Sequence, residues 1–373
     1  MILQILKRLA YFLAGLLSLS LIGLQAYKII LRIATRIEAP NGISSLEEIE
    51  LGGQRQWIFI RGEDRNNPIL IFLHGGPGAP LFGISSARTL YAELIKHFTV
   101  VHWDQRGTGK SYSRDIPAKS LTLDRQVEDC NELIDFTRNR FNAQKVFVVG
   151  HSWGSVIGIR TVYRYPEKIH AFVGVGQIIN YHEKLTISYD FVVDAAKKSG
   201  DVRRLNTLEE IGPPPFDTLE ELNVLNSYIS HYGGVMRNMG FEQVIAMLGF
   251  LTSPEYSLSE GINAVRLKGM DFTIRALWDE MEGIDLAEEI RSIEVPIYFF
   301  EGKFDMANPT VIVEDFYNSL GDREDIHLVI FEGSAHFPML EEREKYQDLL
   351  VSVASKECQG ESPNSEGVSY VRT

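Results

Sequence analysis

Short apolar runs alternate with amphipathic stretches along most of this chain. Seven runs rich in β-branched and aromatic residues predict strands, and four longer stretches with helical periodicity predict helices. The predicted strands are 56–61, 69–73, 98–103, 145–149, 171–176, 296–300 and 326–331, and the predicted helices are 85–97, 123–141, 155–165 and 342–355. Strands separated by helices are typical of a mostly parallel sheet that helices cover on both faces. The pattern therefore predicts an α/β fold.

The first forty residues follow a different pattern. Residues 9–26 form an uncharged stretch of eighteen positions, which follows Lys7 and Arg8 and precedes Lys28. At a rise of ~1.5 Å per residue this stretch is about 27 Å long, just enough to cross the hydrocarbon core of a bilayer. Residues 1–36 are therefore predicted to form an N-terminal transmembrane anchor. Cations flank both ends, so the sequence leaves the side of the membrane undecided.

Two alternatives to an anchor remain. A cleaved signal peptide usually has a shorter apolar region that ends in a small-x-small cleavage site, whereas this chain has Leu24 where a small residue is expected. A buried helix of a soluble protein is the other alternative, favoured by Ser18, Ser20 and Gln25 within the stretch.

The alternation of strands and helices stops between residues 181 and 290. This segment has helical patterns, loops and a rigid break at 211–218, "IGPPPFDT", but no convincing strand. An insertion of this size after a strand predicts a helical lid over the carboxyl edge of the sheet. It would divide the core into 37–180 and 291–355, followed by a flexible tail at 356–373. The predicted lid is acidic, with 19 Asp and Glu against nine Lys and Arg.

Composition excludes some function classes. The 373 residues carry a net charge of −13, which argues against nucleic acid as a partner because phosphate binding needs a basic face. The two cysteines, Cys130 and Cys358, have no spacing typical of a metal or redox site, and they do not form a disulfide framework. We expect no metal and no organic cofactor. The oligomeric state is left open.

The run "GTGKS" at 107–111 looks like the end of a phosphate-binding P-loop. A P-loop needs a glycine five residues before its final Gly-Lys-Ser, so that successive backbone N–H groups surround the phosphates. That position is Asp104, whose carboxylate would repel phosphate. The run must therefore belong to another kind of loop.

The stretch "VFVVGHSWGSVIG" at 146–158 carries the strongest chemical signal. An apolar strand leads into a Gly-x-Ser-x-Gly motif centred on Ser152, and a helical pattern follows. This order is that of a nucleophile elbow, in which glycines allow a close approach of strand and helix and a strained turn exposes the serine hydroxyl. We predict that Ser152 is a nucleophile.

A serine nucleophile needs a base and an orienting acid, in the order Ser, Asp, His along the chain. His336 follows the last predicted strand, where a loop can bring its imidazole to Ser152. Asp305 lies in the turn after the preceding strand, and Glu301, at the end of that strand, is the fallback acid. His151 lies within the elbow and is predicted to point elsewhere. The histidines next to or inside predicted strands are interpreted as structural: His97, His102, His170 and His327.

The stretch "IFLHGGPGAP" at 71–80 predicts the other half of an oxyanion hole. A strand leads into small residues that leave backbone N–H groups accessible to a substrate oxygen. We assign the two donors to the N–H groups of Gly76 and Trp153.

Taken together, these motifs resemble the α/β-hydrolase superfamily. The set is HGGPG, DQRGTGKS, GHSWGS, GKFD and GSAHF, in this order, and the resemblance covers residues 45–355. It is greatest to the proline iminopeptidase-like branch, serine peptidases that remove N-terminal residues, often proline. In that family the loop 104–111 supports the active site, so the resemblance implies that Arg106 braces it and that Lys110 is a surface charge.

Three features depart from the peptidases of that branch. His151 stands where they commonly have glycine, Ala79-Pro80 replaces a glycine run, and their Trp-Glu-Gly signature in the lid is not found. Three hypotheses follow: an aminopeptidase of the proline iminopeptidase type, which is preferred; a carboxylesterase; and a catalytically silent membrane-tethered binding protein. The expected substrate is a small molecule or short peptide, with a free N-terminal amine in the first case. The first two hypotheses differ in whether the lid presents a carboxylate near Ser152.

Overall fold

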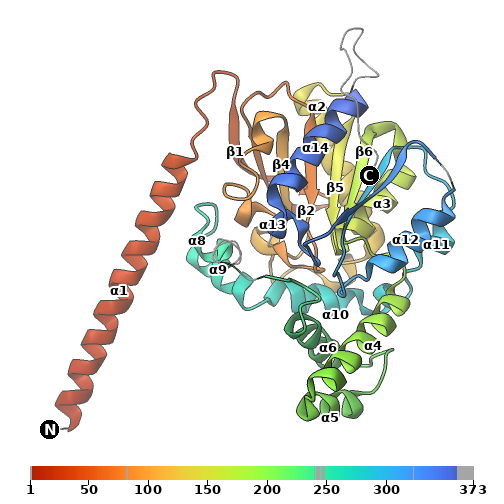
Figure 1. Cartoon of the computed structure of the whole chain (residues 1–373). Helices are drawn as coiled ribbons and strands as arrows, with labels where there is room; N and C mark the ends of the chain where they lie inside the picture. Colours follow the sequence, from red (N-terminus) through yellow and green to blue (C-terminus); the bar gives the residue numbers. More distant parts are fainter. Residues whose placement is uncertain are drawn as a thin grey trace.

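The computed structural model describes residues 2–80, 83–238, 240, 244, 248–321 and 323–358. The tail predicted at 356–373 lies outside these residues from 359 onward, and 356–358 end the last helix. The α/β fold predicted from the sequence is confirmed: a mostly parallel sheet lies between helices (Figure 1).

Eight strands form the sheet, in the order β1-β2-β4-β3-β5-β6-β7-β8. The first three in this order pair antiparallel and the others pair parallel. The strands are β1 (Ile43–Leu51), β2 (Gln54–Gly62), β3 (Ile69–Leu73), β4 (Thr99–Asp104), β5 (Val146–His151), β6 (Ile169–Val175), β7 (Ile297–Gly302) and β8 (Ile326–Phe331). The sequence analysis missed β1, which is an edge strand with mixed polar positions and so lacks a continuous apolar run.

Alternate residues of the central strands pack on opposite faces of the sheet, as the two-residue period of a strand requires. On β3, Ile71 packs in the core cluster that includes Val127 and Leu133 of α2 (Leu123–Phe141), whereas Phe72 packs in the cluster that includes Leu350 of α14 (Arg343–Cys358). Both faces are therefore apolar and covered. This explains why the strands have nearly continuous hydrophobic sequences.

The helix predicted at 85–97 is wrong. The segment contains only two short 3₁₀ turns, Ile84–Ser86 and Leu94–Lys96. The hydroxyls of Ser85 and Ser86 donate hydrogen bonds to the carbonyl oxygens of Pro80 and Gly83, and such local bonds compete with regular helix formation. The apolar residues that gave the periodicity are still buried, against the sheet.

Residues 181–290, here called the helical insertion, follow β6 and precede β7. Its described residues form helices and loops, and they contain no strand. Figure 1 shows α4, α5, α6 and α10 gathered at one end of the sheet. The helices are α4 (Tyr181–Ser199), α5 (Val202–Ile211), α6 (Leu219–His231), α8 (Gly249–Thr252), α9 (Leu258–Val265), α10 (Lys268–Glu282) and α11 (Leu286–Glu289). The remaining helices of the body are α3 (Trp153–Arg164), α12 (Thr310–Ser319) and α13 (Pro338–Glu341).

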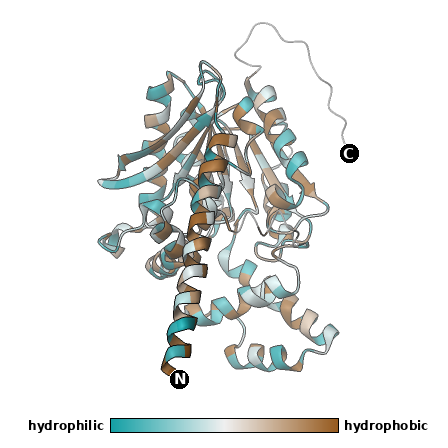
Figure 2. Ribbon diagram, turned by 90° about the vertical axis from the view of Figure 1, so that its left-hand side faces the viewer, coloured by the Kyte–Doolittle hydropathy of each residue, from teal (hydrophilic) through white to brown (hydrophobic). Residues whose placement is uncertain are grey.

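The N-terminal helix α1 (Ile2–Ala34) projects from the body and is long and apolar enough to cross a membrane. None of its most apolar stretch is buried within the chain, and its apolar residues colour most of its length in Figure 2. Its C-terminal end contacts the helical insertion, because Lys28 Nζ and Arg32 donate hydrogen bonds to the carbonyl oxygens of Tyr256 and Pro254 at 2.8 and 2.9 Å. The length and composition of α1 are equally compatible with a signal sequence.

Candidate active site

Ser152 stands on the turn between β5 and α3. Its backbone has φ 53° and ψ −117°, a left-handed conformation that L residues rarely adopt. The close approach of strand and helix requires both flanking glycines: a Cβ on Gly154 would collide with the carbonyl oxygen of Leu73, and a Cβ on Gly150 with that of Gly154. The local geometry is that of a nucleophile elbow.

His336 and Asp305 meet beside this turn. His336 lies in the loop after β8 and Asp305 in the turn after β7, and His336 Nδ1 is 2.7 Å from Asp305 Oδ2. The other carboxylate oxygen of Asp305 accepts hydrogen bonds from the backbone N–H groups of Ala307 and Asn308, both at 2.8 Å. These bonds hold the carboxylate in place. With Nδ1 bonded to Asp305, Nε2 of the neutral imidazole is the nitrogen that can accept a proton.

Glu301, the fallback acid, has a different role. Its side chain is buried at the end of β7 and accepts a hydrogen bond from the backbone N–H of Gln177 at 3.0 Å. Burial raises the pKa of this carboxyl well above its ordinary value. Glu301 bonds to the Gln177 backbone whereas Asp305 bonds to the His336 imidazole itself, so Asp305 is the better candidate.

The prediction that His151 points away from the site is wrong. Its ring centroid is 4.7 Å from that of His336, and its Nε2 lies 3.0 Å from the His336 carbonyl oxygen. Burial, together with the neighbouring His336, lowers the pKa of His151 well below its ordinary value. His151 is therefore a neutral ring that packs against the His336 imidazole and helps to fix the loop of His336.

A cavity of about 500 Å³ joins these groups. Ser152, His336, Gly76 and Trp153 line it, and Asp305 lies behind His336. The helical insertion supplies most of the remaining wall, including Tyr181, Lys184, Leu222, Asn226, Ser230, Val235, Leu267, Met270, Ile274 and Met281. The structure thus brings the five predicted site residues together: four of them line one cavity, and Asp305 contacts His336 from behind.

The charge of this cavity bears on the substrate. Among the described residues that line it there is no aspartate or glutamate, and Lys184 is the one lysine or arginine. The acidic side chains of the insertion point elsewhere in the described part of the chain; Glu280 and Glu260, for example, are bonded to the Leu123 backbone and to Lys110. The acidic composition of the segment does not make this wall acidic.

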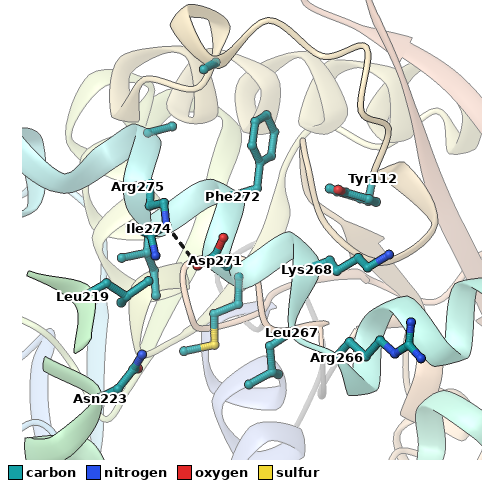
Figure 3. A pocket seen from close by; sticks show the side chains of 13 residues that line it. Tyr112, Leu219, Asn223, Arg266, Leu267, Lys268, Asp271, Phe272, Ile274 and Arg275 are labelled. Carbon is teal, nitrogen blue, oxygen red and sulfur yellow. Dashed lines mark hydrogen bonds and ion pairs between the residues drawn. The ribbon is translucent and has the colours of Figure 1, made fainter. Parts of the chain in front are cut away.

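A second pocket, of about 620 Å³, lies against α10 (Figure 3). It shares Leu267, Met270 and Ile274 with the catalytic cavity, so the first half of α10 separates the two spaces. Its charged side chains are Arg266, Lys268, Asp271 and Arg275, and Asp271 pairs with Arg275 at 3.0 Å. Ser152, Asp305 and His336 do not line this second pocket, so the first cavity is the candidate active site.

The loop 104–111 supports the site from beneath. Asp104 is fully buried and accepts hydrogen bonds from the backbone N–H of Lys110 at 2.7 Å and from the hydroxyl of Tyr256. Burial raises its pKa to about 6. Arg106 braces this loop, as expected, through a bidentate ion pair with Asp129 of α2, with hydrogen bonds of 2.7 and 2.9 Å.

Lys110 departs from the surface charge that the resemblance implied. Its side chain is 7% exposed, pairs with Glu260 at 3.0 Å and lies 4.5 Å above the centre of the Trp57 ring. The ammonium therefore ties the loop to α9 of the helical insertion. A sequence cannot show this, because Glu260 is 150 residues away.

Three residues of the site were missed by sequence reasoning. Gly176 follows β6 with φ 52°, and a Cβ there would lie 2.9 Å from both Nδ1 and Cε1 of His336. The Asn308 amide donates a hydrogen bond to the Gly176 carbonyl oxygen at 2.6 Å, while its own backbone N–H binds Asp305. Lys184 is bonded to the same turn. None belongs to a motif that spacing alone identifies, although Asn308 is only three residues from Asp305.

We expect the variant Gly176→Ala to lower kcat by ~10–100-fold, because the new methyl group displaces the imidazole and misplacement of ~1 Å can cost about a hundredfold. The matched control is Gly200→Ala, at φ 70°, where the new methyl group would have no other atom within 4 Å. The control carries the same backbone strain but does not touch His336. Equal losses in the two variants would contradict a positioning role of Gly176. Steady-state kinetics and thermal melting of both variants make the comparison.

Comparison with known proteins agrees with this geometry. Residues 81–240 match the family described as serine aminopeptidase, S33. The chain is similar to the protein named "Probable aminopeptidase YbaC" from Bacillus subtilis (strain 168), with 29% identity over 316 residues that cover 84% of this chain and 97% of the relative. It is also similar to a proline iminopeptidase from Heyndrickxia coagulans, with 26% identity over 81% of this chain and 96% of the relative. A crystal structure of proline iminopeptidase from Mycobacterium smegmatis superposes with a TM-score of 0.60 and 16% identity, over 85% of this chain and 100% of that one.

The chain has the α/β-hydrolase fold. The family match and the superposed crystal structure agree with this fold, and the similarity to the aminopeptidase relatives extends over most of the chain. Within the described residues of this hydrolase, no group of three or more His, Cys, Asp or Glu side chains is arranged to hold a metal ion.

Proposed function

We propose that this α/β hydrolase cleaves an amide or ester bond through an acyl-enzyme formed on Ser152. The observation that carries the proposal is the hydrogen bond of 2.7 Å between His336 and Asp305, on the cavity where Ser152 occupies a strained elbow. His336 takes the proton of the Ser152 hydroxyl as that oxygen attacks the substrate carbonyl carbon. The same imidazolium then protonates the leaving amine or alcohol, and water, activated in turn by His336, hydrolyses the acyl-enzyme.

The oxyanion formed in each step needs hydrogen-bond donors. We assign this role to the backbone N–H groups of Gly76 and Trp153, both residues of the cavity wall. Trp153 is the first residue of α3, where a backbone N–H has no partner within the helix and where the helix dipole favours negative charge. Loss of one such donor typically costs ~10²–10³ in kcat.

We further propose the division into an anchor at 1–36, a hydrolase core at 37–180 and 291–355, a helical lid at 181–290 and a tail at 356–373. The lid assignment is supported by the cavity wall that the helical insertion contributes. The anchor is supported by the exposed apolar surface of α1. If α1 is a retained anchor, the full-length protein stays in the membrane pellet after a carbonate wash; recovery of a shortened, soluble protein would instead indicate a cleaved signal sequence.

Two substrate classes are supported by different observations. The relatives named as aminopeptidases favour removal of N-terminal residues, as in the proline iminopeptidase type. The charge of the cavity favours the carboxylesterase alternative: an α-ammonium group needs a nearby carboxylate, whereas the described cavity wall offers Lys184, which repels it. On geometry, we favour an ester or amide without a free amine.

The experiment compares a prolyl arylamide, its N-acylated form and a short-chain aryl ester, each with the full-length protein in detergent and with Ser152→Ala. We expect cleavage of the ester and, at most, weak cleavage of the arylamide. Efficient cleavage of the arylamide that N-acylation blocks would establish the aminopeptidase instead. Rates equal to those of Ser152→Ala for all three compounds would favour the silent binding protein.

A further inference from the structure

Lys184 presents a positive charge to the catalytic cavity without a carboxylate partner. It extends from the first turns of α4, and its Nζ donates hydrogen bonds to Asn308 Oδ1 at 3.0 Å and to the Ala307 carbonyl oxygen at 3.3 Å. Both acceptors are neutral oxygens. No aspartate or glutamate of the described chain lies within 4 Å of this ammonium group, which also lies 5.0 Å above the centre of the Tyr181 ring. An ammonium group has three N–H donors, so one remains available.

The position of Lys184 relates it directly to the proposed chemistry. Ala307 and Asn308, its two acceptors, are the residues whose backbone N–H groups hold the carboxylate of Asp305. Lys184 therefore lies on the Asp305 side of the site and lines the same cavity as Ser152. A substrate with its carbonyl at Ser152 could therefore place a second group at Lys184 within the same cavity.

The rest of the cavity wall makes this cation costly unless an anion binds. Its neighbours on the insertion are largely apolar, among them Leu222, Met270, Ile274 and Met281. Burial in such surroundings disfavours the charge of Lys184, which Asp305 balances only in part. A carboxylate from the substrate would supply the missing acceptor, and charge-assisted hydrogen bonds are the stronger ones in proteins.

The neighbouring pocket in Figure 3 has the same sign of charge. Arg266 and Lys268 line it beside Leu267, which both spaces share, and within the described chain neither has a carboxylate within 4 Å. These two cations stand out because the helical insertion as a whole is acidic. Two unpaired cations beside the cavity would attract an anionic substrate toward it.

We propose that Lys184 binds a carboxylate or similar anionic group of the substrate, so that the natural substrate is an ester or amide that also carries an acid group. This inference rests on the proposed function, since it takes Ser152 as the place where the scissile carbonyl lies. It makes Lys184 a specificity residue. The competing interpretation is that Lys184 only ties α4 to the turn at Asp305.

The kinetic test uses matched esters. Aryl esters of linear monoacids are compared with aryl esters of diacids of equal chain length, from four to eight carbons, and a second series carries the carboxylate on the aryl leaving group. The readout is the ratio of kcat/KM for the anionic and the neutral member of each pair. A variant of Lys184 could also lower the rate for both members of a pair by disturbing Asn308 and, through it, Asp305. Such a common loss of kcat/KM cancels in this ratio.

We expect the full-length enzyme to prefer the anionic member in at least one series, and Lys184→Gln to lower that ratio by about 10- to 100-fold, the usual effect of losing a hydrogen bond to a charged group. Lys184→Arg should retain most of the preference. Lys197→Gln, a change of an exposed lysine on the same helix, is the matched control and should leave the ratio unchanged. A preference for the neutral members, or a ratio that Lys184→Gln does not alter, would overturn the proposal.

The pH dependence gives a readout that a purely structural lysine would not move. Burial lowers the pKa of Lys184 to about 8, against the opposing effect of Asp305. The anionic preference should therefore fall as pH rises through about 8. Tyr181, the other titratable group in contact, stays neutral there because burial raises its pKa. Protonation of His336 affects both esters of a pair and divides out.

A binding measurement separates this inference from the proposed catalysis. Monomethyl adipate, which carries one carboxylate, and dimethyl adipate, which carries none, are titrated calorimetrically into Ser152→Ala and into Ser152→Ala carrying Lys184→Gln. Tighter binding of the monomethyl ester that disappears in the double variant supports the anion site even if no ester is turned over, in which case the proposed function alone fails. Equal binding of the two compounds in both variants overturns the anion site even if turnover is normal.

Discussion

Ser152→Ala is expected to lower kcat by ~10⁶ on whichever ester or amide the enzyme cleaves best, leaving a residual rate due to the oxyanion hole and substrate binding. The effect is this large because, in the proposed mechanism, the serine oxygen is the atom that forms the covalent bond with the substrate. Alanine also keeps the Cβ, so that the turn between β5 and α3 retains its shape.

The control for Ser152→Ala is Ser155→Ala, three residues further along α3. Ser155 Oγ donates a hydrogen bond to the Ser152 carbonyl oxygen and accepts one from the Ile178 backbone N–H, but it does not line the cavity. This variant should lose stability rather than most of its activity. A Ser152→Ala enzyme that keeps more than about a hundredth of the activity would contradict a covalent mechanism on this serine.

Asp305→Asn is expected to lower kcat by ~10⁴ while the fold is preserved. The amide would donate a hydrogen bond to His336 Nδ1 where the carboxylate now accepts one, which places the imidazole proton on Nε2. That nitrogen could then no longer take the proton of Ser152. Thermal melting, measured with the kinetics, should show a much smaller effect than the rate.

The matched control is Glu301→Gln, at the other acidic position at the end of β7. Burial raises the pKa of Glu301 well above its ordinary value, and glutamine has nearly the same shape as this side chain. The Gln177 N–H keeps its acceptor, and we expect kcat within about tenfold of the starting enzyme. A larger loss in Glu301→Gln than in Asp305→Asn would transfer the role of orienting acid to Glu301.

The fold was predictable where one physical constraint acts locally. The buried strands at 69–73 and 326–331 have apolar runs that leave little choice, and the predicted bounds agree with β3 and β8. The segment 85–97 has equally good apolar periodicity, but serine hydroxyls bond to nearby carbonyl oxygens there and interrupt the helix. Edge strand β1 was missed because one of its faces is polar.

Candidate site residues were predictable where a motif combines position and chemistry. Ser152, Asp305 and His336 each follow a strand, and the carboxyl ends of parallel strands meet at one edge of a sheet. Lys184 and His151 could not be placed in this way. Their roles depend on how helix α4 and the loop of His336 pack across the site, contacts between residues about 120 and 185 positions apart.

The central claim is that Ser152 is a nucleophile activated by His336. Its most direct test is reaction of the full-length enzyme with a fluorophosphonate, followed by intact mass measurement and peptide mapping. We predict one adduct per chain, on Ser152, with labelling abolished in Ser152→Ala and greatly slowed in His336→Ala. Labelling at another residue, or no reaction of the folded enzyme at all, would contradict the claim.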